Sequence, residues 1–170
     1  MRQTLALFLS LLLLHALAGQ VNHALTPLHI HLFAGGLFVT YAAFMLPLGP
    51  GMAVSLFGGA ICDAAAPVPF GAHALLFAAA HALLFQLRAR VPRDEPRIQL
   101  WAALAANLAF YLVLSYVTLA RSPVRAQVLP RLASDLFWSE IVLAIVAPWF
   151  FALQARALQI ARAEPWRTAS

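Results

Sequence analysis

One acidic residue stands in the most apolar part of this sequence and is its strongest candidate for chemistry. Asp63 closes a small-residue run that includes Gly58 and Gly59, and a proline turn and a second apolar segment follow it. A carboxylate at the centre of a membrane span costs about 2.5–3.5 kcal/mol to insert, so it persists where it faces protein or water and has a partner. We therefore expect the functional site at this hairpin, which also contains Pro69 and Gly71.

Histidines are the second group of residues that could take part in chemistry, because imidazole and carboxylate are good ligands for zinc, nickel or cobalt. Five of them are expected near the same membrane face as Asp63, the extracytoplasmic one in the topology below: His15, His23, His29, His31 and His73. His73 and His81 share a broad face of one apolar segment and are the candidate metal ligands. No two histidines have the i, i+4 spacing of a helical metal site, so contacts with lipid headgroups or carbonyls are the favoured interpretation, and no cofactor is predicted.

Polar residues also occur inside the later apolar segments. Asn107, Tyr111 and Ser115 follow one another at four-residue spacing and lie on one helical face. This face could be the wall of a polar pathway, but hydrogen bonds between helices, at about 0.6 kcal/mol each, are the favoured interpretation. Glu140 could be a coupling carboxylate, but its expected position near a helix end favours a water-exposed residue. Cys62 is interpreted as a packing residue, and a single cysteine excludes an internal disulfide or a cysteine-based metal site.

The composition indicates that the segments which carry these residues lie in a lipid environment. Of 170 residues, 63% are hydrophobic and 10% are charged, and the mean hydropathy is +0.83. A soluble domain has about a quarter of its residues charged, so the chain is expected to be an all-α integral membrane protein. Its net charge of +5 comes from arginines in short connections, which suits anionic lipid and not nucleic acid.

Six membrane spans are predicted from the apolar segments and from the proline and glycine clusters that separate them. A crossing helix needs about 20 residues, with about 17–25 tolerated. The third span is short, and its small residues favour a place inside the bundle, with protein on all sides, over a locally thinned membrane. The predicted spans cover residues 4–18, 28–46, 51–66, 70–87, 100–120 and 136–155 of a single membrane domain, and residues 156–170 form a short tail.

The arginines predict the orientation of these spans. With six spans, the two termini and the second and fourth connections share one side and carry eight arginines, against three on the other side. Because basic residues stay on the cytoplasmic side, both termini are expected in the cytoplasm of a bacterial inner-membrane protein. The first span also resembles a signal peptide, with Arg2, an apolar stretch and Ala16-Leu17-Ala18, but its retention in the bundle is the favoured alternative.

The hairpin sequence resembles a family signature. Gly58-Gly59-Ala60-Ile61-Cys62-Asp63, followed by Pro69-Phe70-Gly71-Ala72-His73-Ala74-Leu75, is similar to the G-x-x-x-D…P-x-G-x-x-A-L motif of the rod shape-determining protein MreD family. The chain length, the Pro/Gly break before the hairpin, the basic loop after it and the basic end of the last span also agree with that family.

The resemblance implies a fold and a role. The fold is a helical bundle related in architecture to the substrate-binding subunits of energy-coupling-factor transporters. The role is non-catalytic scaffolding in bacterial cell-wall elongation, together with an MreC-like membrane protein and, through it, MreB-like filaments and peptidoglycan synthases. Asp63 would then fix the hairpin by accepting hydrogen bonds from amides at the start of the fourth span.

A function from a different class stays open at this point. The chain could be the substrate-binding membrane subunit of a vitamin or metal-ion transporter, with Asp63, His73 and His81 lining the site. Such a subunit should have a polar cavity among its helices, whereas a scaffold should have a packed interior and an exposed groove or apolar face. The sequence contains no recognisable nucleophile–base pair, phosphate-binding loop or large soluble domain, so an enzyme is not expected.

Overall fold

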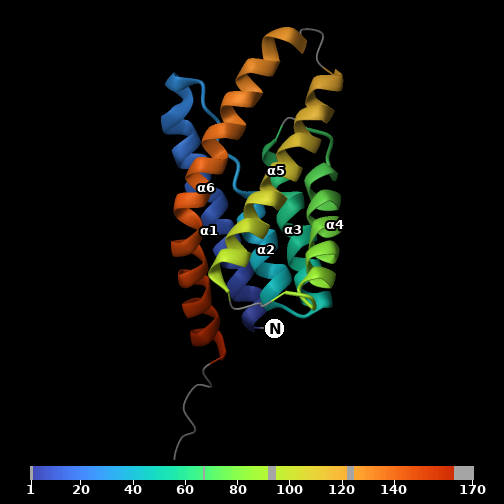
Figure 1. Cartoon of the computed structure of the whole chain (residues 1–170), viewed down its shortest axis with the longest axis vertical. Helices are drawn as coiled ribbons and strands as arrows, with labels where there is room; N and C mark the ends of the chain where they lie inside the picture. The colour runs from blue at the N-terminus through green and yellow to red at the C-terminus, as the bar shows by residue number, and fades with distance from the viewer. Residues whose placement is uncertain (1, 67, 92–94, 122–124, 163–170) are drawn as a thin grey trace, which may run out of the picture.

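The chain folds into a bundle of α-helices, described here from a computed structural model that covers residues 2–66, 68–91, 95–121 and 125–162 (Figure 1). The expected all-α class is confirmed, and no strand occurs among the described residues. The elements are α1 Arg2–Leu25, the 3₁₀ turn η1 Thr26–Leu28, α2 Gly35–Met45, α3 Leu48–Ala65, α4 Ala72–Leu87, α5 Pro96–Arg121 and α6 Arg125–Arg162. The loop around Arg93 and the tail beyond Arg162, which the topology prediction uses, lie outside the described residues.

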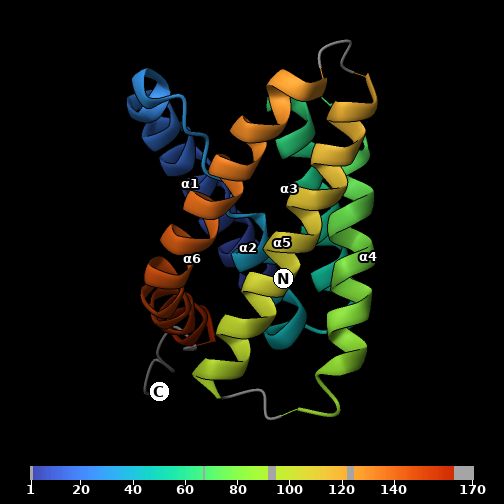
Figure 2. The same ribbon diagram turned by 45° about the horizontal axis from the view of Figure 1, so that its top comes forward.

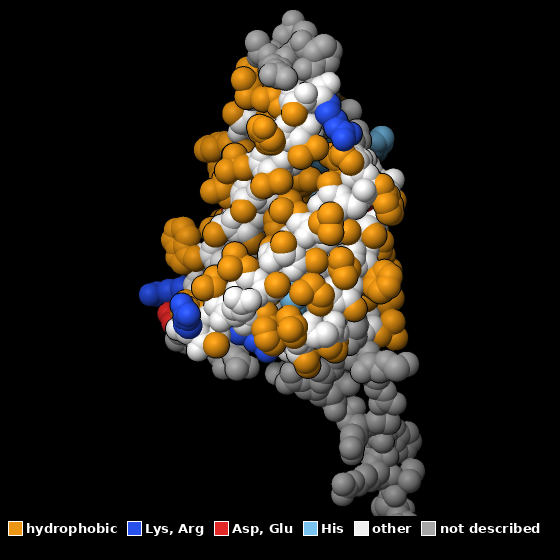
Figure 3. Space-filling view, turned by 90° about the vertical axis from the view of Figure 1, so that its right-hand side faces the viewer, with side chains coloured by type: hydrophobic (Ala, Val, Ile, Leu, Met, Phe, Trp, Pro, Cys, Tyr) orange, Lys and Arg blue, Asp and Glu red, His pale blue; other side chains and the backbone are white. Residues whose placement is uncertain are grey.

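The exterior of the bundle has the character of a lipid-facing surface. Four helices, α1, α3, α5 and α6, are long and apolar enough to cross a membrane, whereas α2 and α4 are apolar but shorter. Large side chains point outward all around, and Leu75, Trp101 and Trp149 are 71%, 70% and 80% exposed. Figure 3 shows apolar side chains over most of one face, with charged side chains at its lower left and one basic side chain near its upper right. The prediction of a membrane protein is therefore supported by helix length and by surface composition.

Helix α2 lies at the centre of the bundle and is its most enclosed element. Nine of its eleven residues, 36–44, are buried. It packs against α3, α4, α5 and α6, and Figure 2 shows α5 lying between α4 and α6 on one side of it. The prediction that the third span is surrounded by protein is wrong, because α3 buries one face only and exposes Leu56 and Phe57.

The predicted span at residues 28–46 also requires correction. Helix α2 begins only at Gly35, and residues 29–34 form a non-helical segment that descends from the upper end of α1 to the start of α2 (Figure 1). His29, with a left-handed φ of 55°, follows the 3₁₀ turn and starts this segment. A non-helical backbone at membrane depth is tolerated only where protein groups satisfy its amides and carbonyls, and the site described below supplies them.

The remaining predicted segments coincide with helices apart from their ends. Helix α1 continues past residue 18 to Leu25, and α6 starts at Arg125 instead of residue 136 and includes Pro130 and Pro148. Glu140 therefore lies well inside a helix, and the prediction that it sits near a helix end is wrong. The first described turn of α1 and the last of α6 lie at the same end of the bundle (Figure 1), as an even number of crossings requires.

Helices α3 and α4 form an antiparallel hairpin with the most extensive contact of any helix pair in the described chain. Helix α1 lies against α3 and α6 and buries Leu7 and Leu11 in the common core. Gly58 of α3 allows this approach, because a Cβ there would lie 2.5 Å from Cδ2 of Leu11. The hairpin and α1 together enclose the end of the bundle that contains Asp63.

Candidate functional site

Asp63 accepts four hydrogen bonds across the tip of the α3–α4 hairpin. Its Oδ2 accepts from the backbone amides of Gly71, at 2.9 Å, and Ala74, at 3.2 Å. Its Oδ1 accepts from the backbone amide of His73, at 2.8 Å, and from Nδ1 of the same residue, at 2.9 Å. The carboxylate is buried at the N-terminus of α4, where unpaired amides and the helix dipole favour an anion. The predicted bonds from amides at the start of the fourth span are confirmed.

Two glycines make this arrangement sterically feasible. Gly59 faces α4 directly, and a Cβ on it would lie 2.4 Å from Cα and 2.5 Å from N of Ala74, which no side chain tolerates. Gly71 has a φ of 98°, in the region that favours glycine, and it is the residue before the first turn of α4. Pro69 accepts the first hydrogen bond of the intervening turn through its carbonyl. These motif residues and Asp63 therefore form one closely packed turn.

His73 is held rigidly beside Asp63. Its side chain is only 5% exposed, and its ring centroid lies 5.9 Å from that of Phe33 and 6.1 Å from that of Phe77. A carboxylate only accepts hydrogen bonds, so the neutral imidazole carries its proton on Nδ1 and leaves Nε2 as an acceptor. No hydrogen bond to Nε2 occurs among the described residues. Asp63 thus fixes both the orientation and the tautomer of this imidazole.

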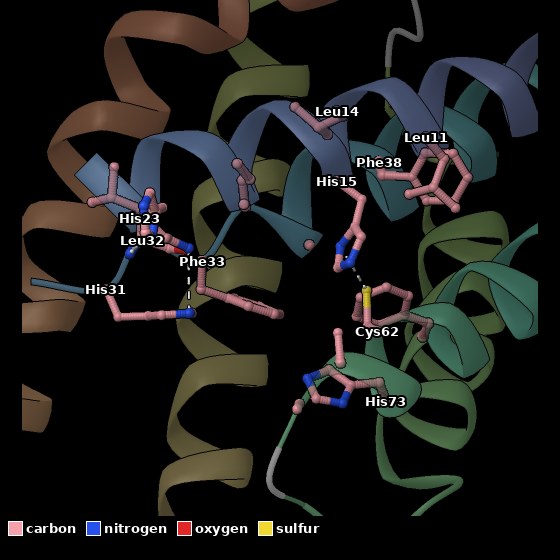
Figure 4. A pocket seen from close by; sticks show the side chains of 18 of the residues that line it. Leu11, Leu14, His15, His23, His31, Leu32, Phe33, Phe38, Cys62 and His73 are labelled. Atoms are coloured by element: carbon pink, nitrogen blue, oxygen red, sulfur yellow. Dashed lines mark hydrogen bonds between the residues drawn. The ribbon is translucent and has the colours of Figure 1, made fainter. Parts of the chain in front are cut away.

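His73 forms part of the wall of a cavity of about 460 Å³, which lies between α1, the 29–35 stretch and the adjoining ends of α3 and α4 (Figure 4). Most of the wall is apolar. Its polar members are His15, Asn22, His23, Thr26, His31, Cys62 and His73. No aspartate, glutamate or arginine belongs to the described lining. The structure therefore gathers four of the five histidines predicted near this face, while His29, His81 and Asp63 lie outside the wall.

The non-helical segment 29–34 forms one side of the cavity and is tied to α1. Asn22 pairs with the backbone of Leu32 in both directions: its Oδ1 accepts from the amide at 2.7 Å, and its Nδ2 donates to the carbonyl at 2.9 Å. Its Nδ2 also lies 3.3 Å from Nε2 of His31. An asparagine side chain thereby replaces the strand or helix partner that this backbone lacks, as burial in a membrane requires.

Helix α6 provides the other attachment of the same segment. Asp135 accepts a hydrogen bond from the His31 amide at 2.8 Å, and the Ser139 hydroxyl accepts one from the Phe33 amide at 3.0 Å. The sequence does not reveal this group, because its hydropathy predicts a helix at residues 28–34 and gives Asp135 and Ser139 no function. The spacing of these two residues by one helical turn was the available signal.

Asn107 joins three helices at the start of α2. It is fully buried, its Oδ1 accepts from the Gly36 amide at 3.2 Å, and its Nδ2 donates to Oε1 of Glu140 at 3.0 Å. A Cβ on Gly36 would lie 2.4 Å from a backbone oxygen of α5, which explains the glycine there. The interpretation of Asn107 as an interhelical hydrogen-bonding residue is confirmed, and Tyr111 and Ser115 are half-buried on the same helix.

Two further histidines contact groups that could act as nucleophiles, which the sequence did not indicate. The ring of His81 is fully buried, with Nδ1 3.1 Å from the hydroxyl of Ser55 and Cε1 against Gly51. Neither Ser55 nor His81 lines the cavity, so a substrate has no route to them there. Cys62 lies 3.9 Å from Nδ1 of His15 in the cavity wall, and no third group orients that imidazole among the described residues. Both contacts are consistent with packing.

Arg88 closes the opposite end of α2. Its Nη1 donates to the carbonyls of Ala43, at 2.9 Å, and Leu46, at 2.7 Å, and its guanidinium lies 3.5 Å from the ring centroid of Phe85. Helix α2 stops before Pro47, so its last carbonyls need donors from elsewhere. An arginine that contributes to the predicted orientation thus also stabilises the central helix.

The described residues contain no group of three or more histidine, cysteine, aspartate or glutamate side chains that could hold a metal ion. His73 and His81, the candidate ligands, bind separate partners, Asp63 and Ser55. Comparisons with protein-family models, curated proteins and solved structures gave no match.

Proposed function

We propose that this chain is a non-catalytic membrane scaffold of the bacterial cell-wall elongation machinery, similar to the MreD family and involved in cell-shape determination. The observation that carries the proposal is the hairpin turn, in which Gly59, Asp63 and Gly71 of the resembling motif each have a conformational task. Gly59 allows contact of the two helices, Asp63 binds the amides of α4, and Gly71 adopts a backbone angle that other residues avoid. A motif whose residues fix the conformation of a helix turn suits a protein that presents a surface to a partner.

The chemistry of the hairpin supports a role without catalysis. Each carboxylate oxygen of Asp63 already accepts two hydrogen bonds, and the side chain does not line the cavity. A general base must reach the proton that it abstracts, and Asp63 has no such access. Its charge is used to hold the turn together.

In this proposal the chain crosses a bacterial inner membrane six times, with both termini in the cytoplasm and an architecture like that of energy-coupling-factor substrate-binding subunits. The eleven residues of α2 span only about 16 Å as a helix. The extended segment 29–34 adds up to about 20 Å, so the two together match the hydrocarbon core of about 30 Å. The arginine excess on the side of the two ends supports the orientation.

The expected partner is an MreC-like membrane protein, and through it MreB-like filaments and peptidoglycan synthases. Association of helices in lipid depends on close packing of apolar surfaces, and Phe70 and Leu75 expose such a surface beside the hairpin. No nucleic-acid partner is expected.

Affinity purification tests this partner. The tagged chain is extracted in mild detergent from the bacterium that encodes it, and co-purified proteins are identified by mass spectrometry. We expect an MreC-like protein to co-purify with the unmodified chain. Its recovered amount should fall for Gly59→Leu, because this change forces α3 and α4 apart. The amount should be unchanged for Gly49→Leu, because the added side chain meets open space. The yield of monodisperse protein is measured for each variant. Recovery of ATP-binding transporter subunits in place of an MreC-like protein would overturn the proposal.

The cavity favours a second candidate, the substrate-binding subunit of a small-molecule transporter. Of the residues expected to line such a site, His73 belongs to the wall, whereas Asp63 and His81 do not. This candidate predicts an ATPase partner in the same purification, so that one experiment separates the two functions.

A further inference from the structure

We propose that the cavity beside His73 is a binding site for an uncharged small molecule with an apolar body and an N–H or O–H group that donates to Nε2 of His73. The site goes beyond the scaffold function and does not depend on it. If the transporter candidate holds, the same cavity is its substrate site.

The size and walls of the cavity define the class of ligand. Its volume of about 460 Å³ lies within the range of about 300–1,000 Å³ that is usual for small-molecule sites. Phe33, Phe38 and Phe77 line it together with leucines, and aromatic walls favour a planar ring by stacking. The described lining contains no aspartate, glutamate or arginine, so a charged ligand would lose its hydration without a fixed counter-charge. The walls therefore select an uncharged, mainly apolar molecule.

Most polar groups of the wall already have partners. Asn22 uses its amide on Leu32 and on Nε2 of His31, and the Thr26 hydroxyl donates to the carbonyl of Asn22. The thiol of Cys62 lies against His15. These groups hold the walls in place and leave little for a ligand.

Nε2 of His73 is the acceptor of the wall whose orientation a buried carboxylate fixes. Asp63 holds the opposite nitrogen at 2.9 Å, which keeps the proton on Nδ1 and leaves Nε2 as a fixed acceptor in a ring that is 5% exposed. Figure 4 shows this imidazole below Cys62 and His15, on the far side of the cavity from His31. This Nε2 is not among the fully buried atoms without a partner in the described residues, so it is open to the cavity, and a ligand that donates to it there gains a hydrogen bond. The ligand therefore needs a donor at this position.

Two matched probes test the hydrogen bond. 5-Fluoroindole is a flat, uncharged, apolar ring with one N–H donor, and 5-fluorobenzofuran has the same shape with an oxygen that cannot donate. Both are titrated by fluorine NMR into the purified full-length chain in detergent micelles, and the response of empty micelles is subtracted. We expect the indole to bind about three- to tenfold more tightly than the benzofuran, the ratio that one net hydrogen bond provides.

Three variants locate the probe. His73→Asn keeps an amide donor for Asp63 but has no atom at the Nε2 position, so the preference for the indole should disappear. Gly19→Leu adds a bulky side chain to the cavity wall, since Gly19 lines the cavity and an added Cβ meets no atom within 4 Å. It should weaken the binding of both probes. Gly49→Leu is the control, because Gly49 is equally open and lies outside the wall.

Each outcome decides the proposal. Equal binding of the two probes to the unmodified chain would assign the cavity to apolar chains, such as lipid or detergent, and would overturn donor recognition. Binding of both probes that is unchanged by Gly19→Leu would place the probe elsewhere and would also overturn it. The Gly19→Leu result stands even where His73→Asn does not fold, because it requires no change at the hairpin.

Discussion

Replacement of Asp63 by alanine should destabilise the chain more than any other single loss of a carboxylate. The change removes four hydrogen bonds, three of them from backbone amides that have no other acceptor in a buried turn. Hydrogen bonds between helices in a membrane average about 0.6 kcal/mol each, so the loss amounts to at least about 2.4 kcal/mol in the free energy of unfolding. Bonds to a charged acceptor are stronger, which places the expected value above this figure.

Glu140→Ala is the matched control. It also removes a carboxylate from the bundle, but Glu140 accepts a single hydrogen bond among the described residues, from Asn107 at 3.0 Å, and it is only half-buried. Its expected loss is about 0.6 kcal/mol, roughly a quarter of that for Asp63→Ala.

Unfolding of the purified variants in mixed detergent–SDS micelles, followed by fluorescence of the four tryptophans, gives both free energies. Asp63→Asn should fall between the other two variants, because one carbonyl oxygen still accepts while the amide group now meets donors. A loss for Asp63→Ala equal to or smaller than that for Glu140→Ala would refute the assignment of Asp63 as the residue that holds the hairpin.

Three other predictions follow from the helix contacts and the arginines. Gly59→Leu should prevent normal accumulation of folded protein while Gly49→Leu does not, because only the first glycine faces backbone within 2.6 Å; quantitative immunoblotting of membranes checks this. Asn107→Ala should lower the free energy of unfolding by about 1–3 kcal/mol, because it leaves the buried Gly36 amide without its acceptor, and an unchanged value would remove its role at α2. A reporter fused after Arg97 should be active in a cytoplasmic form and silent in a periplasmic form, and the opposite pattern would invert the orientation.

The sequence predicted the helical class and the hairpin because both depend on local information. An apolar stretch of sufficient length indicates a helix in lipid, and a Gly–Asp–Pro–Gly pattern over one turn restricts the backbone to few conformations. Asp63 could be singled out because a carboxylate in such a stretch needs a partner, and its nearest amides lie only eight to eleven residues away.

The non-helical segment 29–34 could not be predicted in the same way. Its conformation depends on Asn22 of α1 and on Asp135 and Ser139 of α6, and the α6 contacts lie more than 100 residues away in sequence. Hydropathy alone predicts a continuous span over residues 28–46, because it takes no account of hydrogen-bond donors and acceptors on other helices. The cavity depends on that segment, so the sequence does not predict its position, although it does predict four of the lining histidines near this membrane face.

The central claim is the scaffold function, and depletion of the protein in the bacterium that encodes it tests this claim most directly. Cell width is measured by microscopy as the protein level falls, and uptake of labelled vitamins and divalent metal ions is measured in the same cultures. The account predicts rounded or swollen cells with uptake unchanged until shape is lost. Cells of normal shape that have lost uptake of one such nutrient would contradict the account and establish the transporter function.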